Sequence, residues 1–201
     1  MKRVRVIKLG GSLLTLPHLK EKFHRWCREN PHPLTLIIVG GGGVVDAVRA
    51  IDKANSLAED FAHWVCIDLM RHTARLAHRI LGDVELYETM DELQQPFSGS
   101  KKDATTPIIA VVQVGICFAR EHPNMGLPDS WEVTSDALAA AFGNMYAAEE
   151  LVIMKSIDVP IGDVPIGDEQ LEDLADAGIV DPYFPELACE FNVRFVNLRT
   201  F

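Results

Sequence analysis

An apolar run that ends in four consecutive glycines places the strongest constraint on the fold. Residues 34–39 read Leu-Thr-Leu-Ile-Ile-Val, and Gly-Gly-Gly-Gly follows at 40–43. A run of this kind is typical of a strand buried on both faces, as in a parallel sheet covered by helices on both sides. Residues 3–9 form a second strand-like segment that stops at Gly10-Gly11. The sequence therefore predicts two parallel strands, each ending in a glycine turn.

Helix-like and strand-like segments alternate along the whole chain. Helical spacing of apolar residues predicts helices over 16–29, from residue 44 onward, and over 56–81, 134–147 and 168–177. Short apolar runs predict further strands over 84–87, 108–114, 151–154 and 193–198. This alternation predicts one α/β domain over residues 1–201, a three-layer α/β/α sandwich with a mainly parallel central sheet.

The longest predicted helix, residues 56–81, carries an apolar stripe at helical spacing. The stripe consists of Leu57, Phe61, Trp64, Val65, Leu69, Leu76 and Ile80. We expect this stripe to face the core, and we expect Trp64 to be a core aromatic.

Composition narrows the class of partner. The net charge of −10 argues against nucleic acid and anionic membranes, because their phosphate-rich surfaces favour clustered Lys and Arg. The four cysteines are scattered and form no Cys-x-x-Cys pair, so no metal site or redox dithiol is predicted. No apolar run approaches the roughly 20 residues that span a bilayer, and no apolar leader segment is present. We expect a cytoplasmic protein.

Both glycine loops follow predicted parallel strands, at the edge where open α/β sheets bind ligands. Glycines let backbone N–H groups approach phosphate or carboxylate oxygens closely. Four in a row exceed what a turn requires, so the 40–43 loop favours ligand contact. A Walker A loop is absent because the chain has no Gly-Lys pair. A dinucleotide fingerprint from Gly40 meets Val45 in place of its third glycine, which makes a nicotinamide dehydrogenase a poorer alternative.

Four charged residues lie close to the ends or starts of these elements. Lys8 lies two residues before the first glycine pair, where its ammonium either reaches the ligand site or extends to the edge of the sheet. Asp136 begins a helix after Thr-Ser, and it either complements the helix dipole or bonds Lys8; the residues alone favour neither. Lys155 and Asp158 follow the next strand, where an ordinary solvated turn is the simpler interpretation.

Taken together, these segments resemble the amino acid kinase superfamily, which includes acetylglutamate, aspartate, uridylate and isopentenyl phosphate kinases. The resemblance rests on Lys-Leu-Gly-Gly-Ser at 8–12, the glycine loop followed by Asp46, the Thr-Ser-Asp-Ala-Leu-Ala-Ala segment at 134–140, and the strand and loop at 151–158. The four motifs occur in the family's order and span about three quarters of the chain.

The resemblance implies an ATP-dependent kinase that uses Mg²⁺, binds a small acidic molecule and forms a homo-oligomer. Lys8 would stabilise the phosphoryl group in transfer, and Asp136 would orient that lysine. The implied site residues are Lys8 and Asp136 for catalysis, Gly10, Gly11, Ser12, Lys155 and Asp158 for ATP, and Gly41, Gly42, Gly43 and Thr134 for the acceptor. A non-catalytic relative that only binds a nucleotide or an anion is the alternative.

Two departures from the family pattern bear on this interpretation. Many members carry a second catalytic lysine near the C-terminus that has no match here, and the chain is shorter than most members. Residues 127–136 and His63-Trp64 resemble a short subgroup that is associated with methanofuran biosynthesis and phosphorylates a furan alcohol phosphate. Trp131 and Trp64 are either core aromatics or rings that stack on the furan. The amide donors of the 40–43 loop favour a phosphate monoester as acceptor.

Overall fold

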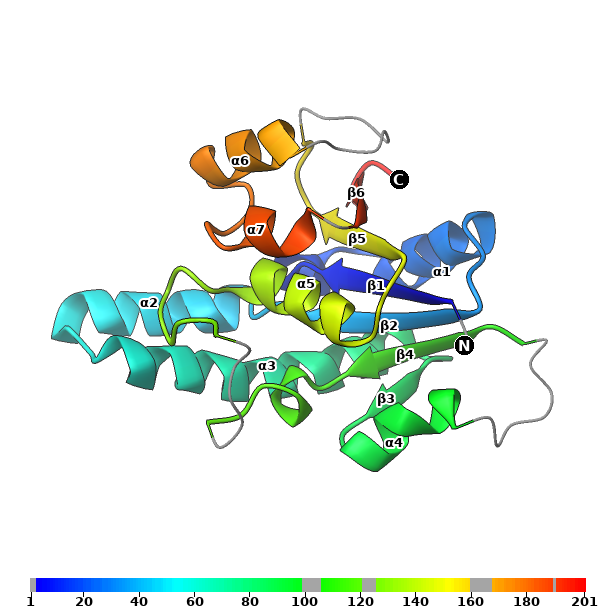
Figure 1. Ribbon diagram of the computed structural model, residues 1–201, viewed down its shortest axis with the longest axis horizontal. Coiled ribbons are helices and arrows are strands. Elements are labelled where there is room, and N and C mark those ends of the chain that lie inside the picture. The colour runs from blue at the N-terminus through cyan, green and yellow to red at the C-terminus, as the bar shows by residue number, and fades with distance from the viewer. Residues whose placement is uncertain (1–2, 99–105, 121–125, 160–167, 190) are drawn as a thin grey trace.

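Six parallel strands form one sheet in the computed structural model (Figure 1), which describes residues 3–98, 106–120, 126–159, 168–189 and 191–201. The strand order is β3-β4-β2-β1-β5-β6, and every neighbouring pair is parallel. The strands are β1 Val4–Leu9, β2 Leu34–Val39, β3 Glu85–Tyr87, β4 Ile108–Val112, β5 Glu150–Lys155 and β6 Asn192–Asn197. The prediction of a mainly parallel sheet is therefore confirmed, with β1 and β2 at its centre.

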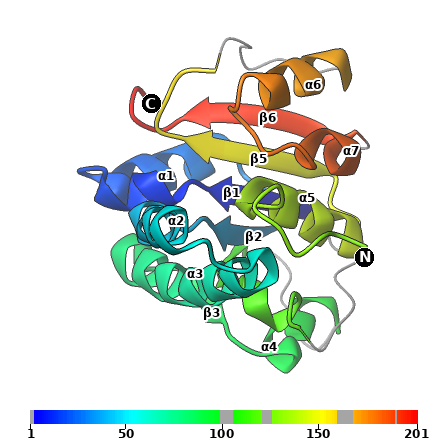
Figure 2. The ribbon, with the colours of Figure 1, turned by 90° about the vertical axis from the view of Figure 1, so that its left-hand side faces the viewer.

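Helices cover both faces of this sheet, as Figure 2 shows, with α1 and α3 on one face and α5 and α7 on the other. The helices are α1 Leu19–Glu29, α2 Gly43–Asn55, α3 Glu59–Leu81, α4 Met90–Gln94, α5 Ser135–Met145, α6 Asp168–Asp176 and α7 Phe184–Ala188. Short 3₁₀ segments η1, η2 and η3 span Gly11–Thr15, Gln95–Phe97 and Val114–Ile116. The sequence did not predict α4 and α7, because five residues are too few to show a helical period. None of the described helices combines the length and the hydropathy that crossing a bilayer requires.

Side-chain alternation along β1 divides the core into two clusters. Val4 and Val6 pack on the α5 face of the sheet, whereas Ile7 and Leu9 pack on the α1 face. Because successive residues of a strand point to opposite faces, Lys8 belongs to the α5 face. The same rule places Lys155 on the α5 face of β5, since Leu151 and Ile153 pack there.

The prediction for the buried face of α3 is wrong. Phe61 and Leu76 are 53% and 52% exposed, Ile80 is also exposed, and the other stripe residues are only half-buried. The side chains that α3 buries are Ala62, His63, Ile67, Met70, Thr73, Ala74, Ala77 and Leu81. Small residues let this helix approach the sheet closely, so residue size as well as hydropathy decides which face is buried. Trp64 is partly buried against the α5-face core, and its indole donates a hydrogen bond to Asp129 at 2.8 Å.

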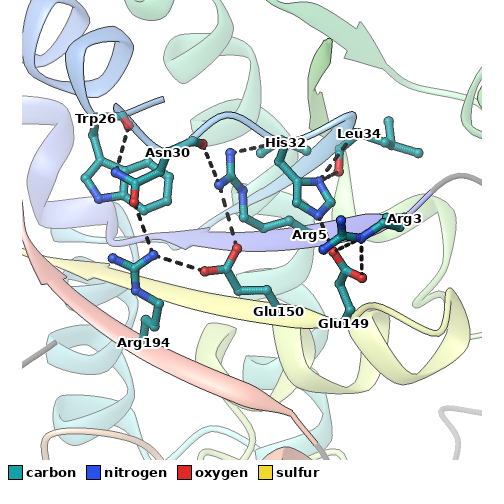
Figure 3. A network of polar contacts seen from close by, with 10 residues as sticks. Arg3, Arg5, Trp26, Asn30, His32, Leu34, Glu149, Glu150 and Arg194 are labelled. Atoms are coloured by element: carbon teal, nitrogen blue, oxygen red, sulfur yellow. Dashed lines mark hydrogen bonds and ion pairs between the residues drawn. The ribbon is translucent and has the colours of Figure 1, made fainter. Parts of the chain in front are cut away.

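The amino ends of the strands are joined by a charged network (Figure 3). Arg5 is buried, lies over the Trp26 ring at 4.8 Å, and donates hydrogen bonds to Asn30 and Thr35. Glu150 lies between two guanidinium groups, 3.7 Å from that of Arg5 and 3.2 Å from that of Arg194. Burial lowers the pKa of Arg5, and the nearby carboxylate opposes this effect. The Glu150 carboxylate therefore balances the positive charge of Arg5 on β1 and of Arg194 on β6.

Glu150→Ala should lower the free energy of unfolding by roughly 3 kcal/mol, because it leaves the buried Arg5 without its carboxylate. Urea unfolding followed by circular dichroism measures this change. The matched control is Asp68→Ala, which removes an exposed ion pair with Arg71 and should hardly shift the midpoint. Equal, small effects of the two substitutions would contradict a structural role for the network.

Candidate active site

A cavity of about 390 Å³ opens at the carboxyl ends of β1, β2 and β5. The two glycine loops form its inner end, and α2 and the first half of α3 form one side. Residues 130, 131 and 133–135, in the segment that leads into α5, also line it. In Figure 1, α2 and the start of α3 extend past the ends of the strands, and residues of both helices line the cavity. The position agrees with the ligand site of open α/β sheets.

The two glycine loops pack backbone against backbone. A Cβ atom on Gly11 would lie 2.2 Å from the amide nitrogen of Gly42, and Gly42 itself has a φ of +54°. A Cβ atom on Gly41 would lie 2.0 Å from the Val45 side chain. Close packing therefore requires glycine at these positions, in addition to any contact with a ligand.

The glycine amides differ in what they bind. Gly10 and Gly40 donate to the carbonyls of Met154 and Leu9 at 2.9 Å, so their amides extend the sheet. Within the described residues, the amides of Gly41 and Gly42 donate to no other backbone group, and both residues line the cavity. These two amides are available to an anion.

Gly43 is placed differently from the other three glycines. It is the first residue of α2, has open space around its Cα, and is not among the residues that line the cavity. The structure thus brings Gly41 and Gly42 to the predicted acceptor site and leaves Gly43 outside it.

Two lysines share one buried carboxylate at the inner end of the cavity. Lys8 Nζ lies 2.8 Å from Asp136 Oδ1, and Lys155 Nζ donates to Asp136 Oδ2 at 3.2 Å. Lys155 also donates to the carbonyl of Ile179. Both lysines line the cavity, and Asp136 is buried behind them. The predicted contact between Asp136 and Lys8 is confirmed, and Lys155 joins it.

Burial and charge oppose one another in this triad. Burial alone would raise the pKa of Asp136, but the charges of Lys8 and Lys155 outweigh it and hold the pKa below its usual value. Burial lowers the pKa of Lys155, and repulsion from Lys8 lowers it further, while Asp136 opposes both effects. The carboxylate therefore stays ionised, and the lysines present two positive charges to the cavity.

Asp181 is a site residue that sequence reasoning missed. It is buried, and its Oδ2 accepts hydrogen bonds from the Thr134 amide, the Thr134 hydroxyl and the Ala137 amide at 3.2, 2.8 and 2.9 Å. The predicted cap residue Thr134 makes no side-chain bond to its own helix, so Asp181 caps α5 in its place. Burial raises the pKa of Asp181. No local signal reveals this contact, because 47 residues separate Asp181 from Thr134.

The remaining predicted residues divide into two groups. Ser12 and Thr134 line the cavity, and the Ser12 hydroxyl lies 3.1 Å from that of Ser156. Asp158 does not line the cavity, and its carboxylate accepts a hydrogen bond from Asn197 at 2.6 Å. The structure therefore separates Asp158 from the other predicted residues.

Trp131 lines the outer part of the cavity and is held by two contacts. Its indole donates to Asp52 at 2.9 Å, and the Arg49 guanidinium lies over its ring at 5.2 Å. The ring is therefore fixed at the cavity, unlike Trp64, which packs against the core.

Residues 3–160 match the model of the amino acid kinase family. The chain is 28% identical over 155 residues to (5-(aminomethyl)furan-3-yl)methyl phosphate kinase of Methanocaldococcus jannaschii. This match covers 76% of the chain and 66% of the relative, just under two thirds of its length.

Solved kinase structures share the fold. UMP kinase from Ureaplasma parvum has a TM-score of 0.65 at 14% identity, covering 98% of this chain and 90% of that one. Uridylate kinase from Archaeoglobus fulgidus has a TM-score of 0.61 at 16% identity, covering 100% and 93%. Aspartate kinase from Synechocystis has a TM-score of 0.57 at 14% identity, covering 95% of this chain and 38% of that one.

Asp181→Ala should lower the free energy of unfolding by about 1–2 kcal/mol, because the first amides of α5 lose their acceptor. Asp181→Asn should lose less, since its amide oxygen can accept the same bonds. Urea denaturation of the two variants beside the unchanged protein measures the difference. If Asp181→Ala is as stable as the unchanged protein, the hydrogen bonds of Asp181 to α5 do not contribute to the free energy of unfolding.

Proposed function

This chain belongs to the amino acid kinase family, and on that premise we propose that it transfers the γ-phosphoryl group of ATP to a small acidic acceptor. The observation that carries the proposal is the pair of lysines that share Asp136 beside two glycine loops. A phosphoryl group in transfer spreads negative charge over its oxygens, and fixed positive charges stabilise that state. A buried carboxylate that holds both ammonium groups in place provides such fixed charges.

In the proposed mechanism the protein supplies position and charge, and it supplies no nucleophile. An oxygen of the acceptor attacks the γ-phosphorus in line, and the bond to the β-phosphate oxygen breaks. Lys8 and Lys155 stabilise the charge that develops, while Asp136 keeps them in place. Mg²⁺ bound with ATP would neutralise part of the phosphate charge.

Lys155 fills the role of the C-terminal lysine that the sequence lacks. It comes from the end of β5, the strand next to β1, and meets the same carboxylate as Lys8. Its position beside Ser156 and the Ser12 hydroxyl supports binding of ATP phosphates on the β5 side of the cavity, together with Gly10 and Gly11. Gly41, Gly42 and Thr134 then remain for the acceptor.

A phosphate monoester is the acceptor that we propose, and the product is then a pyrophosphate. The free amides of Gly41 and Gly42 and the two lysines suit an acceptor with nearly two negative charges. The named activity of the Methanocaldococcus relative concerns a furan methyl phosphate, and UMP is also a phosphate monoester. A phosphorylated furan alcohol of methanofuran synthesis is therefore the specific acceptor we favour, with Trp131 beside its ring.

Three broader expectations accompany this proposal. We propose that residues 1–201 act as one domain, that the protein works in the cytoplasm, and that it forms a homo-oligomer. The exposed apolar side chains Phe61, Leu76 and Ile80 on α3 support a covered surface on that helix. Light scattering after gel filtration measures the oligomeric state.

Lys8→Ala should lower kcat by roughly 100-fold or more, the usual loss for one electrostatic donor to a transition state. The KM for ATP should change much less, because the lost interaction is made mainly in the transition state. Steady-state phosphorylation of the furan methyl phosphate by Mg-ATP measures both constants. Lys20→Ala, which changes an exposed lysine paired with Asp83, is the control. Full turnover by Lys8→Ala would remove Lys8 from the mechanism, and no product from the unchanged protein would favour the non-catalytic alternative.

The pH profile tests Lys155. Because burial and Lys8 lower the pKa of Lys155 from its ordinary value of 10.5, it loses its charge at a lower pH than a free lysine. We therefore expect kcat/KM for ATP, which reports the free enzyme, to fall as pH rises through that lowered pKa. In Lys155→Arg the guanidinium stays charged beyond about pH 12, so the alkaline fall should disappear. An unchanged alkaline fall in Lys155→Arg would assign it to another group.

A further inference from the structure

His63 lines the cavity and contacts the segment that leads into α5. Its Nδ1 lies 3.1 Å from the carbonyl oxygen of Ser130, and a carbonyl oxygen only accepts, so Nδ1 carries the hydrogen. In a neutral imidazole the other nitrogen, Nε2, then has a free lone pair. His63 lines the cavity and forms no ion pair with a carboxylate in the described part of the chain. With Nδ1 donating to Ser130, Nε2 is the ring nitrogen that can accept a hydrogen bond from a ligand.

His63 lines the same cavity as the two lysines but comes from a different element, α3. It belongs to the second turn of α3, and the start of this helix extends past the ends of the strands (Figure 1). His63 contacts Ser130 and Lys8 contacts Asp136, so the two side chains lie against opposite ends of the segment 130–136. A ligand whose phosphate is held by Lys8 would thus reach His63 with its other end.

Apolar side chains line part of the cavity that His63 lines. Ile67 and Met70 of α3, together with Val133 and Leu138, belong to one hydrophobic cluster and contribute to this lining. A polar group within such a lining selects for a ligand that satisfies it, because an unmatched donor or acceptor loses hydrogen bonds to water. The charged residues Asp46 and Arg49 line the cavity from α2, where both side chains are largely exposed.

We propose that His63 Nε2 selects acceptors with an amine at the end remote from the reacting phosphate. This inference rests on the proposed kinase function and names the acceptor more closely: a phosphate monoester with a small apolar body and a distal N–H donor. An ammonium group is the strongest donor for a neutral imidazole, because a charge-assisted bond is roughly twice as strong as a neutral one. The aminomethyl group in the name of the Methanocaldococcus relative is a donor of this kind.

The test compares two phosphate monoesters, the aminomethyl-furan methyl phosphate and its analogue with methyl in place of aminomethyl. The unchanged protein should prefer the amine roughly 10- to 100-fold in kcat/KM, the range expected for one hydrogen bond to a charged group. His63→Asn is the decisive variant, because the Asn amide can donate to Ser130 as Nδ1 does but leaves no acceptor at the Nε2 position. Its KM for the amine should rise by the same factor, with thermal stability nearly unchanged. His72→Asn, the same change at an exposed position of α3, is the matched control.

The possible outcomes separate the inference from the proposed function. Loss of the preference in His63→Asn but not in His72→Asn supports the inference. Equal phosphorylation of both compounds by the unchanged protein overturns the inference and leaves the kinase proposal intact. Loss of the preference in Asp46→Asn, with the preference retained in His63→Asn, also overturns it, because the amine is then recognised on α2. Phosphorylation of neither compound overturns both.

Discussion

The sharing of Asp136 by Lys8 and Lys155 is the interaction on which the site depends. A buried carboxylate is unfavourable unless it is paired, and each lysine likewise needs a partner once burial removes its water. The triad meets both requirements, and it ties α5 to the ends of β1 and β5. Because two cations share one anion, a positive charge remains, and both ammonium groups face the cavity. A chain with a net charge of −10 thus offers a local attraction for phosphate.

Buried charged side chains lie at both ends of the sheet, and they have different roles at the two ends. At the amino ends, Glu150 lies between Arg5 and Arg194, and further hydrogen bonds from Arg5 to Asn30 and Thr35 complete a structural network. At the carboxyl ends, Asp136 is the side-chain partner of both lysines among the described residues, and both lysines also line the cavity. The carboxyl ends can therefore bind an anion, because two lysines there share only one carboxylate. Ligands reach this edge of the sheet through the loops that follow the parallel strands.

The geometry of the triad depends on close packing around it as well as on its ion pairs. The loops after β1 and β2 touch at Gly11 and Gly42, where a side chain would collide with backbone atoms. Asp181 holds the first turn of α5, and that turn carries Asp136. The positions of the charged groups in the triad thus depend on backbone packing and on a helix cap, and neither of these contacts binds a ligand. The cavity is also lined by apolar side chains of α3, by His63 and by the Trp131 ring, which suits a phosphate joined to a small ring.

The sequence by itself determined the strands and the two glycine loops at their carboxyl ends. It predicted Lys155 beyond the end of its strand, whereas the structure includes Lys155 in β5, and the pairing of β1 with β5 puts both lysines on one face. Only the tertiary structure decided that Asp181 caps α5 from 47 residues away and that Asp158 binds Asn197 outside the cavity. It also decided that α3 buries its small residues and exposes Phe61 and Leu76. The physical reason is that local patterns fix backbone periodicity, whereas partner choice and close approach depend on segments that meet only when the chain folds.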